Sequence, residues 1–117
     1  MSTLGKNLKI TAPRSAQPQT RAMFDAFGAT RLEPAPQLDV FKLDGTSIAF
    51  EYLAEADALT PAQMRIAPWI EIVVDDVGRT TRALAALGCE RLDYHDQEHP
   101  YFAAAGGLVL RLAAPLA

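Results

Sequence analysis

The chain has 117 residues, half of them apolar, and a formal net charge of −3 at pH 7. This length suits one domain that buries roughly two-thirds of its unfolded surface. Acidic and basic residues are interspersed, which excludes the clustered lysines and arginines of a nucleic-acid-binding surface. No apolar run approaches the roughly 18 residues of a membrane span, and no secretion signal is recognised. The single cysteine, Cys89, excludes an intrachain disulfide, so we expect a cytoplasmic protein with neither nucleic-acid nor membrane partners.

The first predicted element is a strand in which Leu8, Ile10 and Ala12 alternate with polar residues. A helix is expected next, with Ser15 as its N-terminal cap and Gly28 at its C-terminal end. The helix carries apolar residues at helical spacing, so one of its sides should pack on the sheet.

A predicted hairpin completes the first half of the chain. The segments LDVFKL at 38–43 and TSIAFEYL at 46–53 read as strands, and Asp44-Gly45 between them is a strong hairpin dipeptide. The proline-containing segment EPAP at 33–36 ends a shorter strand before them.

The second half repeats this order of elements. Residues 69–74 alternate as a strand, Asp75 or Asp76 is expected to cap a helix, and Gly88 ends it. Strands are expected near 90–95, 100–104 and 107–113, the last two joined by a turn at Gly106-Gly107.

The two halves also match in sequence. FDAFGATRL at 24–32 is followed 60 positions later by LAALGCERL at 84–92, and the same offset places Glu51 on Arg111. A repeat of this length predicts two copies of one unit packed around a common core. We therefore predict an α+β fold of two β-α-β-β-β modules, 6–53 and 67–114, joined by a linker at 54–66. A ferredoxin-like fold is the alternative, but its β-α-β repeat leaves two strands in each half without a place.

The motif WIEIVVDDVGRTTRALAALG at 69–88 and the closing strand GLVLRL give the chain a family resemblance. Both resemble the vicinal oxygen chelate superfamily, which includes glyoxalase I, bleomycin-resistance proteins, extradiol dioxygenases and fosfomycin-resistance enzymes. The resemblance covers nearly the whole chain. It implies curved mixed sheets with helices on their convex faces and a concave cleft that holds a metal or a ligand.

The resemblance also implies four metal-ligand positions, which map to Asn7, Glu51, Trp69 and Arg111. Only Glu51 is a credible ligand, because an indole offers only an N–H donor and a guanidinium has no acceptor. Lys9, the neighbouring candidate in the first strand, supplies no ligand either. We therefore predict that the metal site is lost and that no cofactor is bound.

Strand alternation places a set of polar and aromatic residues on the face that would line the cleft. As ligand-binding candidates we name Asn7, Lys9, Glu51, Trp69, Glu71, Tyr101, Arg111 and His99. Trp69 offers a stacking surface, and the charged residues would orient a small molecule. Alternatively, Glu51 and Arg111 pair with each other across the cleft as a structural tie.

Two further groups of residues are candidates for chemistry. His95 and His99 lie in the turn-rich segment YHDQEHPYF, where solvated histidines are commoner than metal ligands, and the offset would place His99 opposite Asp39. Glu51 and Glu71 are the acid–base candidates, and Glu71 would serve as a general base if apolar neighbours buried it.

Three functions compete at this point. The first is a metal-independent small-molecule-binding protein, similar to the drug-sequestering branch of the superfamily. The second is a metal-dependent or acid–base enzyme of the same superfamily, such as a lyase, isomerase or dioxygenase. The third is an interaction module whose cleft is closed by a Glu51–Arg111 pair. The resemblance also implies a homodimer, in which that pair could form between chains.

Overall fold

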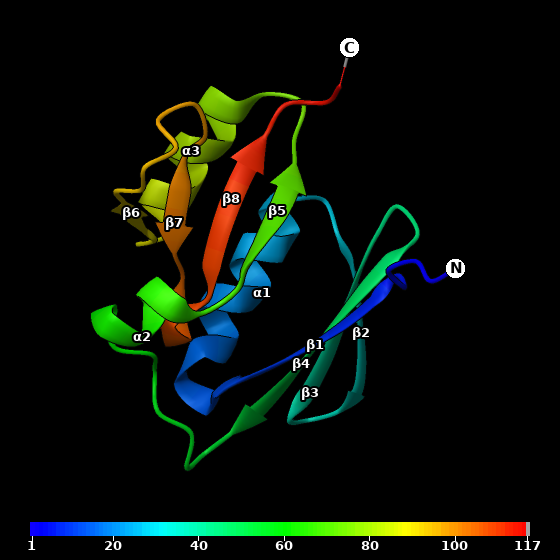
Figure 1. Ribbon diagram of the computed structural model, residues 1–117. Helices are drawn as coiled ribbons and strands as arrows, with labels where there is room; N and C mark the ends of the chain where they lie inside the picture. The colour runs from blue at the N-terminus through cyan, green and yellow to red at the C-terminus, as the bar shows by residue number, and fades with distance from the viewer. Residues whose placement is uncertain (117) are drawn as a thin grey trace.

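The computed structural model describes residues 1–116. Eight strands and three α-helices follow one another in the order that the two-module reading requires (Figure 1). The first part holds β1 (Asn7–Pro13), α1 (Gln17–Ala26), β2 (Thr30–Ala35), β3 (Leu38–Leu43) and β4 (Thr46–Leu53). The second holds α2 (Pro61–Ile66), β5 (Trp69–Val73), α3 (Val77–Ala86), β6 (Glu90–Leu92), β7 (Tyr101–Ala103) and β8 (Val109–Ala113). One-turn 3₁₀ helices lie at Arg14–Ala16 and Ala105–Gly107.

The strands form two separate four-stranded sheets with the same topology. Their orders are β1-β4-β3-β2 and β5-β8-β7-β6. In each sheet the first and last strands of the module pair in parallel, and the other neighbours are antiparallel. The predicted α+β fold with two β-α-β-β-β modules is confirmed. We call β1–β4 with α1 module one, and β5–β8 with α3 module two.

The start of α1 differs from the expectation. Pro13 leads into the 3₁₀ turn Arg14–Ala16, which takes up Ser15, and the N-cap position of α1 falls on Ala16 with no side-chain cap. Ser15 as the cap was therefore wrong. In α3 the cap prediction is confirmed at Asp76, whose carboxylate accepts a hydrogen bond from the Arg79 amide.

The predicted turns are found with different geometries. At the β3–β4 turn Asp44 and Gly45 both have positive φ, as a two-residue hairpin requires. Gly106 and Gly107 also have positive φ, but they belong to the 3₁₀ turn before β8. A Cβ on Gly107 would lie 2.4 Å from the Cβ of Leu59, so glycine is needed there to let the linker approach.

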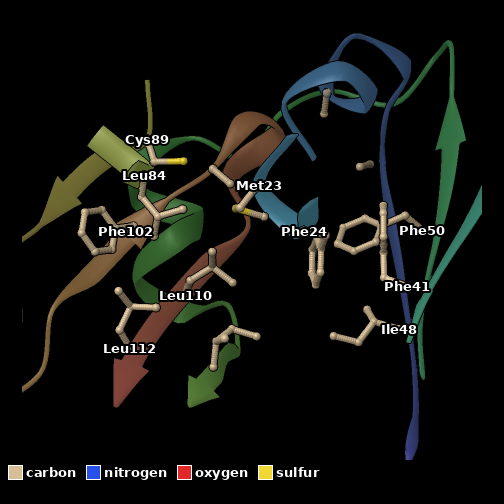
Figure 2. Close-up of a cluster of buried hydrophobic side chains, with 14 of the residues drawn as sticks. Met23, Phe24, Phe41, Ile48, Phe50, Leu84, Cys89, Phe102, Leu110 and Leu112 are labelled. Carbon is tan, nitrogen blue, oxygen red and sulfur yellow. The ribbon is translucent and has the colours of Figure 1, made fainter. Parts of the chain in front are cut away.

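A single apolar core joins the two modules. α1 contributes Met23 and Phe24, which pack with Phe41 and Phe50 from the first sheet. On the other side the core contains Leu84 from α3 and further residues of the second sheet. Figure 2 shows Met23 between the two groups, and α1 contacts α3 directly. The helices therefore cover one face of each sheet and leave the opposite face open.

Strand pairing decides which positions of the two modules correspond. Starting from the matched pair Leu32 and Leu92, the row across sheet one is Leu32, Val40, Ala49, Lys9, and the row across sheet two is Leu92, Tyr101, Arg111, Glu71. Ala49 is thus the counterpart of Arg111, and the predicted match of Glu51 with Arg111 is wrong. The physical reason is that module two has one more residue than module one both between β6 and β7 and between β7 and β8, where the 3₁₀ turn Ala105–Gly107 lies.

The same rows correct the position expected for His99. Tyr101 in sheet two is the counterpart of Val40 in sheet one, so the position before Val40 does not correspond to His99. His99 lies outside β7, in the loop between β6 and β7. Asp39 is buried on the helix side of sheet one, so the two residues are not opposite one another.

Candidate functional site

The open face of each sheet carries the residues that alternate with the core. On β1 these are Asn7, Lys9 and Thr11, and all three are exposed. On β5 they are Trp69, Glu71 and Val73, also exposed. The candidates named from the sequence therefore lie on open faces, but they fall into two groups, one on each module.

The module-one group is a small polar network. The ammonium of Lys9 donates to Glu51 Oε1 and to Thr11 Oγ1, each at 2.8 Å. Both charged side chains are about half exposed, and ion pairs of this kind contribute little to stability. Asn7 lies two residues before Lys9 on β1, where it pairs with Ser47 of β4.

Arg111 anchors the module-two group. Its Nε donates to Glu71 Oε2 at 2.9 Å and its Nη2 contacts the same carboxylate oxygen. Glu51 and Arg111, the expected tie across the cleft, are thus each paired within their own module. The structural tie is not formed within the described chain.

Aromatic rings surround this arginine. The guanidinium carbon lies 4.2 Å from the centroid of the Trp69 ring, a cation–π contact. Tyr101 meets Trp69 edge to face at 5.9 Å, and Tyr94 stacks on Tyr101 at 4.3 Å. Tyr101 is almost completely covered, whereas Trp69 keeps 40% of its surface exposed. A planar molecule can therefore reach the indole from solvent.

The loop between β6 and β7 completes the group through Asp96. Its Oδ2 atom lies 2.7 Å from His99 Nδ1 and accepts a hydrogen bond from the Tyr101 hydroxyl at 3.0 Å. Arg111 Nη1 approaches the same oxygen at 3.5 Å. We call Trp69, Glu71, Tyr94, Asp96, His99, Tyr101 and Arg111 the Trp69 cluster.

The structure thus gathers five of the eight ligand-binding candidates into one cluster and separates the other three. Tyr94 and Asp96 were not among the residues expected from the sequence. A loop of this composition carries no periodic signal, so only the fold shows that it turns back onto the sheet. The segment YHDQEHPY begins and ends with a tyrosine, which is the only sequence signal for the stacked pair Tyr94 and Tyr101.

Electrostatics keep the cluster charged near neutral pH. Burial raises the pKa of Asp96, but the Glu98 amide together with His99 and Tyr101 more than offsets this and holds it at about 2. The hydrogen bond with Tyr101 and the carboxylate of Glu71 raise the pKa of Arg111 against the opposing effect of burial. Asp96 is therefore a carboxylate and Arg111 a cation throughout the physiological range.

The environment of Glu71 does not match the one that a general base requires. That role depends on burial among apolar neighbours, whereas Glu71 is an exposed strand glutamate on β5 that contacts the guanidinium of Arg111.

The metal of the vicinal oxygen chelate proteins does not fit these residues. Strand pairing assigns the four positions to Asn7, Ala49, Trp69 and Arg111, because Ala49 replaces Glu51 in the row. This set contains no carboxylate or imidazole and includes a cation, so it lacks the donors that divalent metals need. Elsewhere in residues 1–116, no group of three or more histidine, cysteine or acidic side chains is placed to hold a metal.

Grooves next to the cluster offer room for a small molecule. The largest, about 690 Å³, lies between α2 and the β6–β7 loop and is lined in part by Met64, Tyr94 and His95. A second groove, of about 310 Å³, includes Tyr94, Asp96 and His99.

No helix within residues 1–116 has the length and apolar character needed to cross a bilayer.

No protein-family model matches the chain, and no curated protein matches it by sequence. Solved structures do match by fold. A variant of the fosfomycin resistance protein FosX from Listeria monocytogenes, in complex with Mn(II) and 1S,2S-dihydroxypropylphosphonic acid, superposes with a TM-score of 0.76 at 18% identity, over 99% of this chain and 93% of that one.

Two further structures agree. FosX from Mesorhizobium loti has a TM-score of 0.72 at 15% identity, over 99% of this chain and 94% of its own. Lactoylglutathione lyase from Agrobacterium tumefaciens has a TM-score of 0.64 at 16% identity, over 97% and 94%. Together with the paired modules, these matches show that the chain has the fold of the vicinal oxygen chelate superfamily.

Proposed function

We propose that the chain is a metal-independent small-molecule-binding protein whose ligand stacks on Trp69 at the open face of module two. The observation that carries this proposal is the Trp69 cluster itself. It combines a solvent-accessible indole, two tyrosines and three charged side chains on a face that the core does not need. Binding sites for small molecules have this composition, with aromatic walls and a few oriented polar groups.

The fold alone does not decide between a binder and an enzyme, because one fold supports many activities. The metal-dependent enzyme is disfavoured by the donor set described above, and the acid–base enzyme by the pairing of Glu71 with Arg111. We therefore place Trp69, Glu71, Tyr101, Arg111 and His99 in the ligand site. Asn7, Lys9 and Glu51 form a second polar group, which we propose contacts only ligands large enough to span both modules.

Trp69 is the only tryptophan in the chain, so its signals report on the site without labelling. The test is a screen of small aromatic compounds observed through the Trp69 indole N–H resonance, followed by calorimetry on any compound that shifts it. Trp69→Ala should weaken binding at least about fivefold, because stacking of a base on an aromatic side chain is worth about 1–3 kcal/mol.

Arg82→Ala, an exposed change on α3, is the matched control for Arg111→Ala. The control should bind as the native chain does, whereas Arg111→Ala, which removes the side chain that packs on Trp69, should change the affinity with little effect on folding. If the indole resonance never moves, or if Trp69→Ala binds normally, the proposal is wrong. Plasma mass spectrometry showing about one transition metal per chain would instead revive the metalloenzyme.

The homodimer that the family resemblance implies is also a proposal. Size-exclusion chromatography with light scattering tests it directly, and a monomeric mass would remove the possibility that Glu51 and Arg111 pair between chains.

A further inference from the structure

We propose that Glu71 sets the charge preference of the Trp69 cluster, so that the site accepts aromatic cations and rejects aromatic anions. This inference rests on the proposed function, since it names the class of ligand that the same site takes.

The hydrogen-bond donors of Arg111 are already engaged within the protein. A guanidinium normally recognises an anion with its Nε and Nη donors, which match the two oxygens of a carboxylate. Here the Nε and Nη2 donors already contact Glu71, which is the direct partner of Arg111 in the pairing of β5 with β8. The remaining Nη1 faces Tyr101 and Asp96. An anionic ligand would have to displace an internal carboxylate to reach the arginine.

The Trp69 cluster carries more negative than positive charge. Glu71 and Asp96 contribute two negative charges, and Arg111 contributes one positive charge. The low pKa of Asp96, about 2, keeps that carboxylate ionised at neutral pH. The faces of Trp69 and the tyrosines add the negative side of their quadrupoles. The site is therefore net negative and lined by rings that attract cations.

The two modules carry opposite charges at corresponding positions of their first strands. The position of Glu71 in module two is taken by Lys9 in module one, because both lie at the end of corresponding rows of the sheets. The sheet accepts either sign of charge at this position, and so does not impose a glutamate. Glu71 therefore competes with an anionic ligand for the donors of Arg111. The side chain at position 71 decides which ligand charge the site admits.

The test compares two small probes that share a phenyl ring, benzyltrimethylammonium and 3-phenylpropionate. Binding to the native chain is followed by the Trp69 indole N–H resonance and by calorimetry, at about 20 mM salt to limit screening. The cation should bind about fivefold to thirtyfold more tightly than the anion, the range that a cation–π contact supplies.

The Glu71→Gln variant keeps the shape of the side chain and removes its charge. It should weaken the cation and strengthen the anion, so that the preference is lost or reversed. Glu55→Gln, in the exposed linker, makes the same chemical change away from the site and should leave the preference intact.

The outcomes separate the two proposals. If the native chain prefers the anion, or if Glu71→Gln leaves the preference unchanged, the charge-selection inference is wrong while the binding function stands. If neither probe shifts the Trp69 resonance at millimolar concentration, the charge-selection inference is wrong, and the wider screen of aromatic compounds decides the binding function separately. A preference for the cation that Glu71→Gln abolishes and Glu55→Gln retains supports the inference.

Discussion

The two modules share one topology but place their aromatic residues on opposite sides of the sheet. In module one Phe24, Phe41, Phe50 and Tyr52 are buried between the sheet and its helix. In module two the core is largely aliphatic, with Phe102 as its aromatic member, and Trp69, Tyr94 and Tyr101 lie on the open face. The same scaffold therefore uses aromatic area for stability in one half and presents it for recognition in the other.

The largest expected effect comes from removing an aromatic ring on the buried side. Phe41 is fully buried and stacks on Phe24 with ring centroids 4.4 Å apart. Phe41→Ala should cost about 4 kcal/mol of unfolding free energy, because it leaves a cavity in a packed core. Trp69→Ala removes a larger ring from the open face and should cost only about 1 kcal/mol. Urea denaturation measures both, and equal losses would contradict the division between the modules.

The next effect concerns the arginines of the two modules. Arg21 holds the buried Asp39 through two hydrogen bonds of 2.9 Å, and Tyr52 donates a third to the same carboxylate. Arg21→Met leaves a buried charge without its cation, which should destabilise the chain by about 3 kcal/mol. Arg111→Met, the same change on the open face, should alter the urea midpoint far less. A loss of stability as large as that of Arg21→Met would make Arg111 a structural residue.

Acid should affect module one through the same buried pair. Burial raises the pKa of Asp39, but the hydrogen bonds from Arg21 and Tyr52 more than offset it, so its pKa lies below the ordinary 3.8. A depressed pKa means that the stabilisation is present above the unfolded value and is lost as pH falls through the folded one. The gap in unfolding free energy between the native chain and Asp39→Asn should therefore narrow as the pH falls below about 5. A constant gap would show that the pair is not the titrating element.

The smallest effect is expected in the loop of module two. A carboxylate only accepts hydrogen bonds, so Asp96 requires the proton of neutral His99 to be on Nδ1. Asp96→Asn introduces an amide that can donate, and the Nε2–H tautomer should increase. Long-range proton–nitrogen NMR of the imidazole, at about pH 8, reads this directly. His95 is the internal control, and a change at both histidines would indicate a general disturbance of the loop.

Much of the fold was predictable because its signals are local. Period-two alternation marked Leu8, Ile10 and Ala12 as a strand, and Asp44-Gly45 marked a hairpin whose positive φ values are confirmed. The correspondence of rows was not predictable in this way. It depends on the lengths of the β6–β7 and β7–β8 connections, each one residue longer than its counterpart in module one, and irregular connections leave no periodic pattern in the sequence.

The site was predictable only in part for a related reason. Alternation places Trp69 and Glu71 on the same face of β5, and Arg111 follows from the pairing of β5 with β8. The contribution of Asp96 comes from an irregular loop whose path is set by contacts with Tyr101 and Arg111. Such contacts join residues that no sequence period relates, so they emerge only with the tertiary structure.

The amide of Gln19 on α1 joins the two modules at a point where their helices meet. Its Nε2 donates to the Leu87 carbonyl at the end of α3, and its Oε1 accepts from the Ala105 amide. With the shared core around Met23, this contact gives the modules a fixed interface that does not run through the linker. The linker therefore behaves as a tether. It keeps each module at a high effective concentration near the other, while the interface itself determines their relative orientation.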